Sequence, residues 1–238
     1  MSKPDRSRPF AALLMVSMVW IAAPASAPQA AGADARPVAF VDLRKQSPVT
    51  GDAAVGRTKS AVCAACHGPQ GNAIAPNFPN LAAQSTTYLY VQLKAFKDGQ
   101  RSDPVMSAQA ATLSDTDMRN LASYYASLPP KPMATVDARA RGAVLFRQGD
   151  PMKGIPPCQG CHGADARGPH PDPANPYPVA WATWPALAGQ NAPYVIKQLT
   201  DYRHGVRTHT STAQVMQRVA TTLDDADVAA LSQYLSSL

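Results

Sequence analysis

Apolar residues recur at helical spacing in several stretches of the chain. In LASYYASL, the apolar side chains at 121, 124, 125 and 128 lie at i, i+3, i+4 and i+7, on one face of a helix. Residues 88–97 and 194–203 are predicted to form further helices that stop near Gly99 and Gly205. No sustained alternation with a period of two appears. The pattern therefore predicts an all-α fold.

Polar residues mark two helix starts. Asp117 follows Ser114 by three positions, and Asp227 follows Asp224 in the same way. A short polar side chain before a helix accepts a hydrogen bond from a backbone N–H three residues on, and an acid at that position can return the bond. A further helix is predicted before each of the two cysteine motifs described below.

The chain repeats itself along most of its length. FPNLAAQSTTYLYVQLKAFKDGQR matches WPALAGQNAPYVIKQLTDYRHGVR at an offset of 106 residues. Beyond this stretch, four extra residues in the second copy raise the offset to 110, and Met106 then pairs with Met216. The paired landmarks include Pro79 with Pro185, Gln84 with Gln190, Gln92 with Gln198, and Arg101 with Arg207. Two homologous units therefore follow one another.

One proline-rich stretch lies between the two units and another lies within the second unit. The stretch SLPPKPMATVDAR has the composition of a linker between helical patterns. We predict one unit at 51–128, a linker at 129–136 and a second unit at 137–238, preceded by an N-terminal arm at 34–50. The second unit contains a proline-rich insertion at 169–185, predicted to be a surface loop. Its role, as part of a partner interface or as a tolerated insertion, is open.

The N-terminus has the pattern of an export signal. Lys3, Arg6 and Arg8 precede FAALLMVSMVWIAA, and small residues follow. This run of about 14 apolar residues is shorter than the roughly 20 that a spanning helix needs. Residues 1–33 are therefore predicted to be a signal peptide cleaved between 25 and 33, with an uncleaved anchor as the alternative. The prediction places the protein in the periplasm and leaves peripheral membrane association open.

Composition narrows the class of partner. The chain of 238 residues has a formal net charge of +6 and only 16% charged residues. No dense cluster of lysine and arginine appears, so a nucleic-acid partner is not expected.

All four cysteines lie in two hexapeptides, CAACHG at 63–68 and CQGCHG at 158–163. Four interpretations compete: a redox-active disulfide, a shared zinc site, structural disulfides, and covalent haem attachment. Thioredoxin-type motifs follow a strand, and zinc sites usually place two Cys pairs about 15–20 residues apart. Structural disulfides do not require His after the second Cys. Cys-x-x-Cys-His is the signature of c-type haem attachment.

The haem interpretation explains the spacing. Two thiols three positions apart on a helical turn can bond both vinyl groups of one porphyrin, and the following His then faces the iron. The sequence thus predicts two covalently bound haem c groups. The residues involved are Cys63, Cys66, Cys158 and Cys161 for attachment, with His67 and His162 on the irons.

The repeat also selects a second axial ligand for each iron. Methionine opposite histidine raises the reduction potential of a haem. Met106 and Met216 occupy equivalent positions, predicted to lie between two helices, and are predicted to be iron ligands. Core filling is the alternative, and His209 is a rival ligand for the second iron. Arg101 and Arg207 are candidates for pairing with haem propionates, with a solvated position at a helix end as the alternative.

On these motifs the chain resembles the cytochrome c4 family. The resemblance covers roughly residues 51–238 and rests on VCAACHG, PPCQGCHG, FPNLAAQ, WPALAGQ and the two Met segments ending in LSDTD and LDDAD. It implies two tandem class I cytochrome c domains, each a small helical bundle around one haem, with His/Met ligation and a pseudo-twofold arrangement. It also implies electron transfer in the periplasm toward a terminal oxidase. The insertion after Pro169 and the longer segment before Met216 depart from the family pattern.

We therefore expect a one-electron carrier and not an enzyme, because each iron has two protein ligands and no open position. One alternative is an electron-transfer subunit of a periplasmic dehydrogenase, for example in sulfide or alcohol oxidation. Another is a dihaem peroxidase or thiosulfate-oxidising enzyme, which would need a vacant or exchangeable sixth position. The expected partners are redox proteins that give and take electrons, such as a terminal oxidase or a dehydrogenase.

Overall fold

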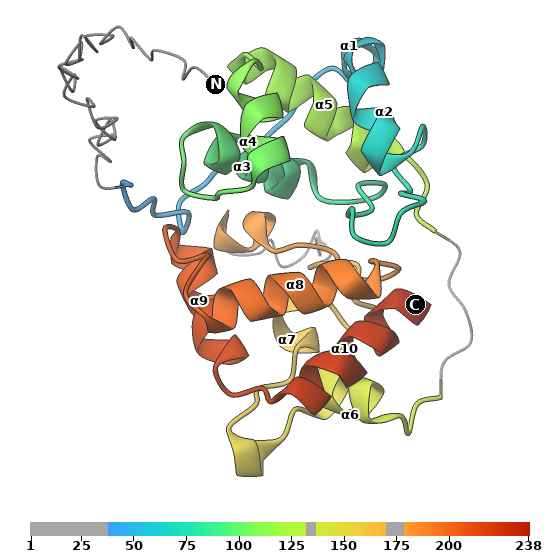
Figure 1. The fold of residues 1–238 in the computed structure, drawn as a ribbon, viewed down its shortest axis with the longest axis vertical. Coiled ribbons are helices and arrows are strands. Elements are labelled where there is room, and N and C mark those ends of the chain that lie inside the picture. Colours follow the sequence, from blue (N-terminus) through green and yellow to red (C-terminus); the bar gives the residue numbers. More distant parts are fainter. Residues whose placement is uncertain (1–37, 132–136, 170–178) are drawn as a thin grey trace, which may run out of the picture. The chain divides into compact units, whose positions relative to one another are not determined.

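Helices provide the regular secondary structure of the protein. A computed structural model describes residues 38–131, 137–169 and 179–238, and within these ranges the only β-pairings are two isolated bridges. Figure 1 shows the helices in chain order. They are α1 (Ala53–Lys59), α2 (Ala61–His67), α3 (Thr86–Lys97), α4 (Pro104–Ala111), α5 (Asp115–Ser127), α6 (Arg141–Gln148), η1 (Pro151–Lys153), α7 (Gln159–His162), η2 (Val179–Thr183), α8 (Ala192–Arg203), α9 (Ser211–Ala220) and α10 (Asp225–Ser237). The all-α prediction is confirmed.

The polar start signals act as helix caps. Ser114 Oγ accepts a hydrogen bond from the Asp117 N–H at 3.1 Å, and Asp117 Oδ2 accepts one from the Ser114 N–H at 3.1 Å. This reciprocal pair begins α5. Asp224 Oδ1 accepts from the Asp227 N–H at 2.8 Å and begins α10. These bonds satisfy N–H groups that have no partner within the helix.

In the first half of the chain, α5 packs against α1 and α3, and α3 also contacts α4. The predicted apolar face of α5 points inward, with Leu121 and Tyr125 buried and Tyr124 half-buried. Leu43 and Val49, which precede α1, complete this core.

The second half repeats this arrangement with its own core. Here α10 packs against α6 and α8, and α8 contacts α9. Phe146 on α6 and Tyr234 on α10 pack with ring centroids 5.6 Å apart. The first and last helices of both halves cross closely at a glycine. A Cβ placed on Gly56 would lie 2.0 Å from the Asn120 carbonyl oxygen, and one on Gly142 would lie 2.1 Å from that of Ala230.

Both methionine segments are helical, which corrects the prediction that they lie between helices. Met106 lies in the first turn of α4, where Asp103 Oδ1 accepts from its N–H at 3.0 Å. Pro104 is at the start of this helix, where the missing N–H costs nothing. Met216 lies within α9, which begins at the capping residue Thr210. These helices are short, with eight and ten residues, and the apolar pattern of α4 in particular is weak.

The arm, described from residue 38, contacts both halves. Val41 donates from its N–H to the His209 carbonyl at 2.8 Å, and Ser211 donates back to the Val41 carbonyl at 3.1 Å. Leu43 N–H donates to Ser211 Oγ at 2.9 Å. Eight residues beyond Val41, Val49 N–H donates to Thr87 Oγ1 at 2.9 Å. The arm therefore joins the start of α9 to the core of the first half.

Several predictions fall wholly or partly outside the described residues: the signal peptide, the start of the arm, linker residues 132–136 and insertion residues 170–178. The described end of the insertion differs from a surface loop. It forms η2, which contacts α3, and Ser85 Oγ donates to the Ala182 carbonyl at 3.1 Å. None of the helices in the described ranges has the length and apolar character needed to cross a membrane.

Candidate functional site

The two cysteine pairs lie on short helical turns. Cys63 and Cys66 are three positions apart on α2, so both side chains lie on the same side of the helix. Cys158 directly precedes the first residue of α7 and Cys161 lies within this helix, at the same separation. All four thiols are partly exposed and none forms a disulfide. Each pair is thus placed to bond one group from one side.

Burial disfavours the thiolate form in both cysteine pairs. Burial raises the pKa of Cys158 to about 11, and it also raises the pKa of Cys63 and of Cys161. Reactive Cys-x-x-Cys pairs instead depend on a lowered thiol pKa. Within the described ranges, no three His, Cys, Asp or Glu side chains gather as a candidate metal cluster.

The histidine that follows each pair is held in one orientation. His67 is 5% exposed, and its Nδ1 lies 2.9 Å from the Pro79 carbonyl oxygen. His162 is 6% exposed, and its Nδ1 lies 2.9 Å from the Pro185 carbonyl oxygen. A carbonyl can only accept, so Nδ1 carries the proton in both rings. The Nε2 lone pair of each ring is then available to a metal.

Burial keeps both imidazoles neutral. It lowers the pKa of His67 and that of His162, and the carbonyl hydrogen bond offsets this only in part. A neutral imidazole with a fixed tautomer is the form that ligates iron. The donor set of thiols and imidazoles therefore fits a covalently attached haem in each half.

Met106 and Met216 are half-buried and occupy equivalent helices. Met106 is on α4, which packs against α3, and Met216 is on α9, which packs against α8. The two methionines are therefore repeated in equivalent places of the two halves, as the two histidines are. Ligation of iron by these sulfurs stays a prediction.

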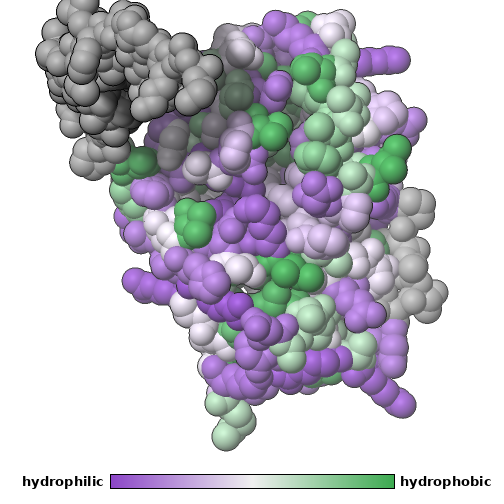
Figure 2. Space-filling view, in the orientation of Figure 1, coloured by the Kyte–Doolittle hydropathy of each residue, from purple (hydrophilic) through white to green (hydrophobic). Residues whose placement is uncertain are grey.

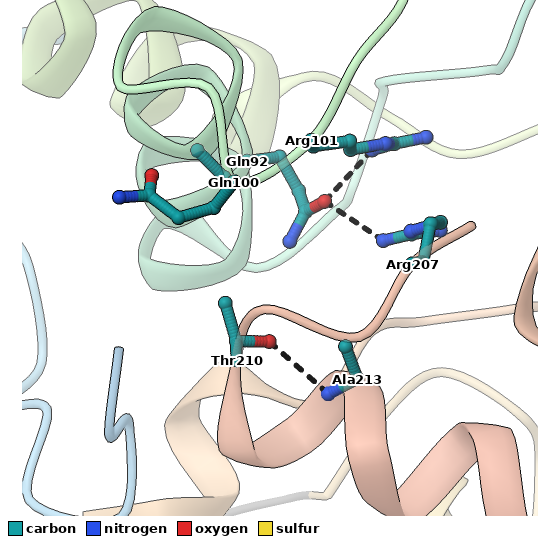
Figure 3. Close-up of a pocket in the computed structure, with 7 residues that line it drawn as sticks. Gln92, Gln100, Arg101, Arg207, Thr210 and Ala213 are labelled. Carbon is teal, nitrogen blue, oxygen red and sulfur yellow. Dashed lines mark hydrogen bonds between the residues drawn. The ribbon is translucent and has the colours of Figure 1, made fainter. Parts of the chain in front are cut away.

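Arg101 and Arg207 form a single cluster between the two halves (Figure 3). Gln92 Oε1 accepts from Arg101 Nη1 at 2.7 Å and from Arg207 Nη2 at 2.9 Å. Gln198 Oε1 accepts from both arginines in the same way. The guanidinium of Arg101 also lies 4.4 Å from the ring centroid of Phe96.

This cluster excludes a solvated position for Arg207, which is only 7% exposed, and Arg101 is half-buried. Within the described part of the chain, neither guanidinium forms an ion pair with a carboxylate. Two positive charges with neutral partners suit acidic groups such as propionates, because charged partners give the stronger hydrogen bonds.

His209, the rival ligand, lies just before the capping residue of α9. Its carbonyl accepts from Val41, and its buried Nδ1 has no hydrogen-bond partner in the structure. It has no counterpart of the carbonyl contact that orients His162.

Sequence reasoning missed the carbonyl groups that orient the histidines. The repeat had paired Pro79 with Pro185, but only as landmarks. Every residue has a carbonyl, so no side-chain pattern identifies one as an acceptor. The shared proline, 12 residues after one His and 23 after the other, was the available signal.

The surface in view is mainly hydrophilic. Figure 2 shows small apolar patches separated by hydrophilic residues on this face.

Comparisons with known proteins show which family this chain resembles. The sequence model of the family described as Cytochrome c matches residues 53–129 and again 140–238. The protein is similar to cytochrome c4 of Pseudomonas aeruginosa, with 43% identity over 79% of this chain and 89% of that one. It is 37% identical to a thiosulfate dehydrogenase electron acceptor of Thiomonas intermedia, over 75% and 79% of the two chains. The crystal structure of reduced recombinant cytochrome c4 from Pseudomonas stutzeri matches with a TM-score of 0.70 and 39% identity, covering 79% of this chain and all of that one.

Proposed function

The chain belongs to the cytochrome c4 family of dihaem electron carriers, and on this premise we propose which of its residues hold the two haems and which proteins it serves. Cys63 and Cys66 attach the first haem, and His67 and Met106 ligate its iron. The second haem has the corresponding residues: Cys158, Cys161, His162 and Met216. The two sites lie in domains at 51–128 and 137–238, joined by the linker at 129–136.

The observation that supports this proposal is the matched orientation of the two histidines. In both halves a buried imidazole directly follows a cysteine pair and donates from Nδ1 to the carbonyl of the paired proline at 2.9 Å. Two independent sites with the same tautomer and burial are what two equivalent iron ligands require.

The haem iron, when bound, supplies one-electron chemistry by changing between its ferrous and ferric states. The chain contributes binding and electrostatics. With Nδ1 protonated, Nε2 of each histidine would be the atom that holds the iron, and the methionine sulfur would be a second protein ligand, leaving no position for a substrate. Arg101 and Arg207 would supply positive charge for the haem propionates, which would favour the reduced state.

The protein exchanges electrons with redox proteins. We propose that it does so in the periplasm, where its predicted signal peptide would deliver it, and that a terminal oxidase is its acceptor. A second candidate has specific support: two relatives are named thiosulfate dehydrogenase electron acceptors. In that case a periplasmic dehydrogenase is the electron donor, and a catalytic chain is expected to co-purify with this protein.

Replacing each methionine in turn tests the ligand assignment. Histidine in place of methionine lowers a haem's reduction potential. We therefore expect Met106→His and Met216→His each to lower one of two midpoints in a spectroelectrochemical titration of the full protein. Each variant should also lose the Met–iron charge-transfer band of one oxidised haem. Met152, which is 96% exposed, gives the control Met152→His, which should change neither midpoint. An unchanged midpoint in Met106→His or Met216→His would remove that ligand from the proposal.

A further inference from the structure

Two glutamines cross the interface between the halves in opposite directions. Gln190 Oε1 accepts from the Asn80 N–H at 2.8 Å, and Gln190 Nε2 donates to the Asn80 carbonyl at 3.0 Å. Gln84 makes the same two bonds to Ala186: Oε1 accepts from its N–H at 2.8 Å and Nε2 donates to its carbonyl at 2.9 Å. Gln84 pairs with Gln190 in the repeat, as Asn80 does with Ala186, so one contact occurs twice.

Each glutamine contacts the peptide group that orients the other half's histidine. The Pro79–Asn80 peptide accepts from His67 through its carbonyl and donates to Gln190 through its N–H. The Pro185–Ala186 peptide does the same between His162 and Gln84. A hydrogen-bonded chain therefore runs from each histidine, through one peptide group, to a side chain of the opposite half.

Both of these series of hydrogen bonds are shielded from water. Gln84 is 7% exposed and Gln190 is 8% exposed, and the two histidines are buried to a similar degree. In such surroundings hydrogen bonds in series polarise one another. A peptide whose N–H is engaged presents a stronger acceptor at its carbonyl. The imidazole that donates to this carbonyl then becomes a more electron-rich ligand.

We propose that Gln84 and Gln190 are positioning residues that adjust the reduction potential of the haem in the opposite half. Gln84 acts on the haem ligated by His162, and Gln190 acts on the haem ligated by His67. An electron-rich histidine stabilises ferric iron, so an intact glutamine bridge lowers the potential of the opposite haem. This inference rests on the proposed histidine ligands.

Removal of one bridge should raise the potential of the opposite haem alone. Methionine has nearly the shape of glutamine and cannot make these hydrogen bonds, so Gln84→Met should raise the second haem's midpoint and Gln190→Met the first haem's. The expected size is an about twofold to fivefold rise in the ratio of reduced to oxidised haem at a fixed potential. Gln84→Asn and Gln190→Asn, which shorten the side chain but keep it polar, should shift the same haems in the same direction.

The measurement is a spectroelectrochemical titration of the full dihaem protein. The Met106→His and Met216→His variants assign each midpoint to a half. Gln92→Met and Gln198→Met are matched controls, because both glutamines lie at the same interface. They contact the arginines and not the peptide groups that accept hydrogen bonds from the histidines. Each arginine bonds both of these glutamines. Neither control should therefore shift the midpoint of the opposite haem alone.

The proposal requires that each substitution shift the midpoint of the haem in the opposite half and leave that of its own half unchanged. A shift of the haem in the same half, an equal shift of both haems, or no shift would overturn it. None of these results would affect the carrier function, because both haems would still be present with His/Met spectra. Failure of the proposed histidine ligands would appear separately: if His67 or His162 did not ligate iron, His67→Met or His162→Met would leave the midpoint and spectrum of that haem unchanged.

Discussion

At the scale of single residues, the glycine that follows each haem-site histidine has a conformation that other residues rarely adopt. Gly68 has φ +76° and Gly163 has φ +80°. A Cβ on Gly163 would lie 2.3 Å from the Gly168 carbonyl oxygen, and one on Gly68 would lie 2.2 Å from that of Asn72. The chain therefore turns away from the histidine through a position that has no room for a side chain.

Alanine at Gly163 should destabilise the second half. With φ +80° and ψ 151°, Gly163 lies in a region that is essentially restricted to glycine, which costs other residues about 1–3 kcal/mol, and the close carbonyl adds to this. Gly160 in the same motif is the matched control, because a Cβ there would meet nothing within 4 Å. We expect Gly163→Ala to lower the free energy of unfolding in urea, and Gly160→Ala to leave it unchanged or raise it. Equal effects of the two substitutions would contradict this account.

Residues of the site differ in how far the sequence could predict them. Cysteine and histidine positions follow from a local motif, since six consecutive residues carry the chemistry. The two methionines required a comparison of the chain with itself. The roles of Gln84 and Gln190 could not be predicted, because each depends on a backbone group about a hundred residues away.

At the scale of helices, α10 begins at a charged cap. Asp224 accepts from the Asp227 N–H, and Lys153 Nζ lies 2.6 Å from its Oδ2. The hydrogen bond from Lys153 is the main reason that the pKa of Asp224 is lowered from 3.8 to about 2. The folded state thus favours the ionised carboxylate, which contributes stability above about pH 3.8 and loses it as the pH falls through about 2.

Asp224→Asn should separate the contribution of the Asp224 charge to stability from the contribution of its capping hydrogen bond. Asparagine is an equally good capping residue, so the substitution removes mainly the interaction with Lys153. We expect the variant to be less stable than the wild type at pH 7, and the difference to vanish as the pH approaches 2. High salt should reduce the difference, since Asp224 is largely exposed. Urea unfolding across this pH range measures the effect. A difference that persists at pH 2 would assign it to the cap instead.

Helix positions were predicted best where the helix is long or clearly capped. The predictions for α3, α5, α8 and α10 agree with the structure to within about two residues at their starts. The short α4 and α9 were missed. Both helices pack on a longer neighbour, α4 on α3 and α9 on α8, and begin at caps, Asp103 and Thr210. Such packing supplies most of the stability of a short helix.

At the scale of the whole molecule, the arginine cluster joins the two halves. Arg207 reaches Gln198 of its own half with Nη1 and Gln92 of the other half with Nη2. Lysine has a single ammonium group and cannot keep both bonds in this geometry. The loss would leave a buried glutamine oxygen with one donor fewer.

Arg207→Lys should therefore loosen the contact between the halves. We expect a loss of about 1–3 kcal/mol and a separation of thermal unfolding into two calorimetric transitions. Arg203→Lys is the matched control, because Arg203 bonds Asp225 and the Leu223 carbonyl within the second half. It should change the stability of that half without separating the transitions. A single, unshifted transition in Arg207→Lys would show that the cluster does not hold the halves together.

The pairing of Val41 with residues 209–211 has a consequence for synthesis of the chain. Ribosomes make proteins from the N-terminus, so Val41 emerges long before its hydrogen-bond partners, about 168 positions downstream. Until then the segment around Val41 has unpaired backbone groups that are open to other contacts. Val41 can form these hydrogen bonds only when translation is nearly finished.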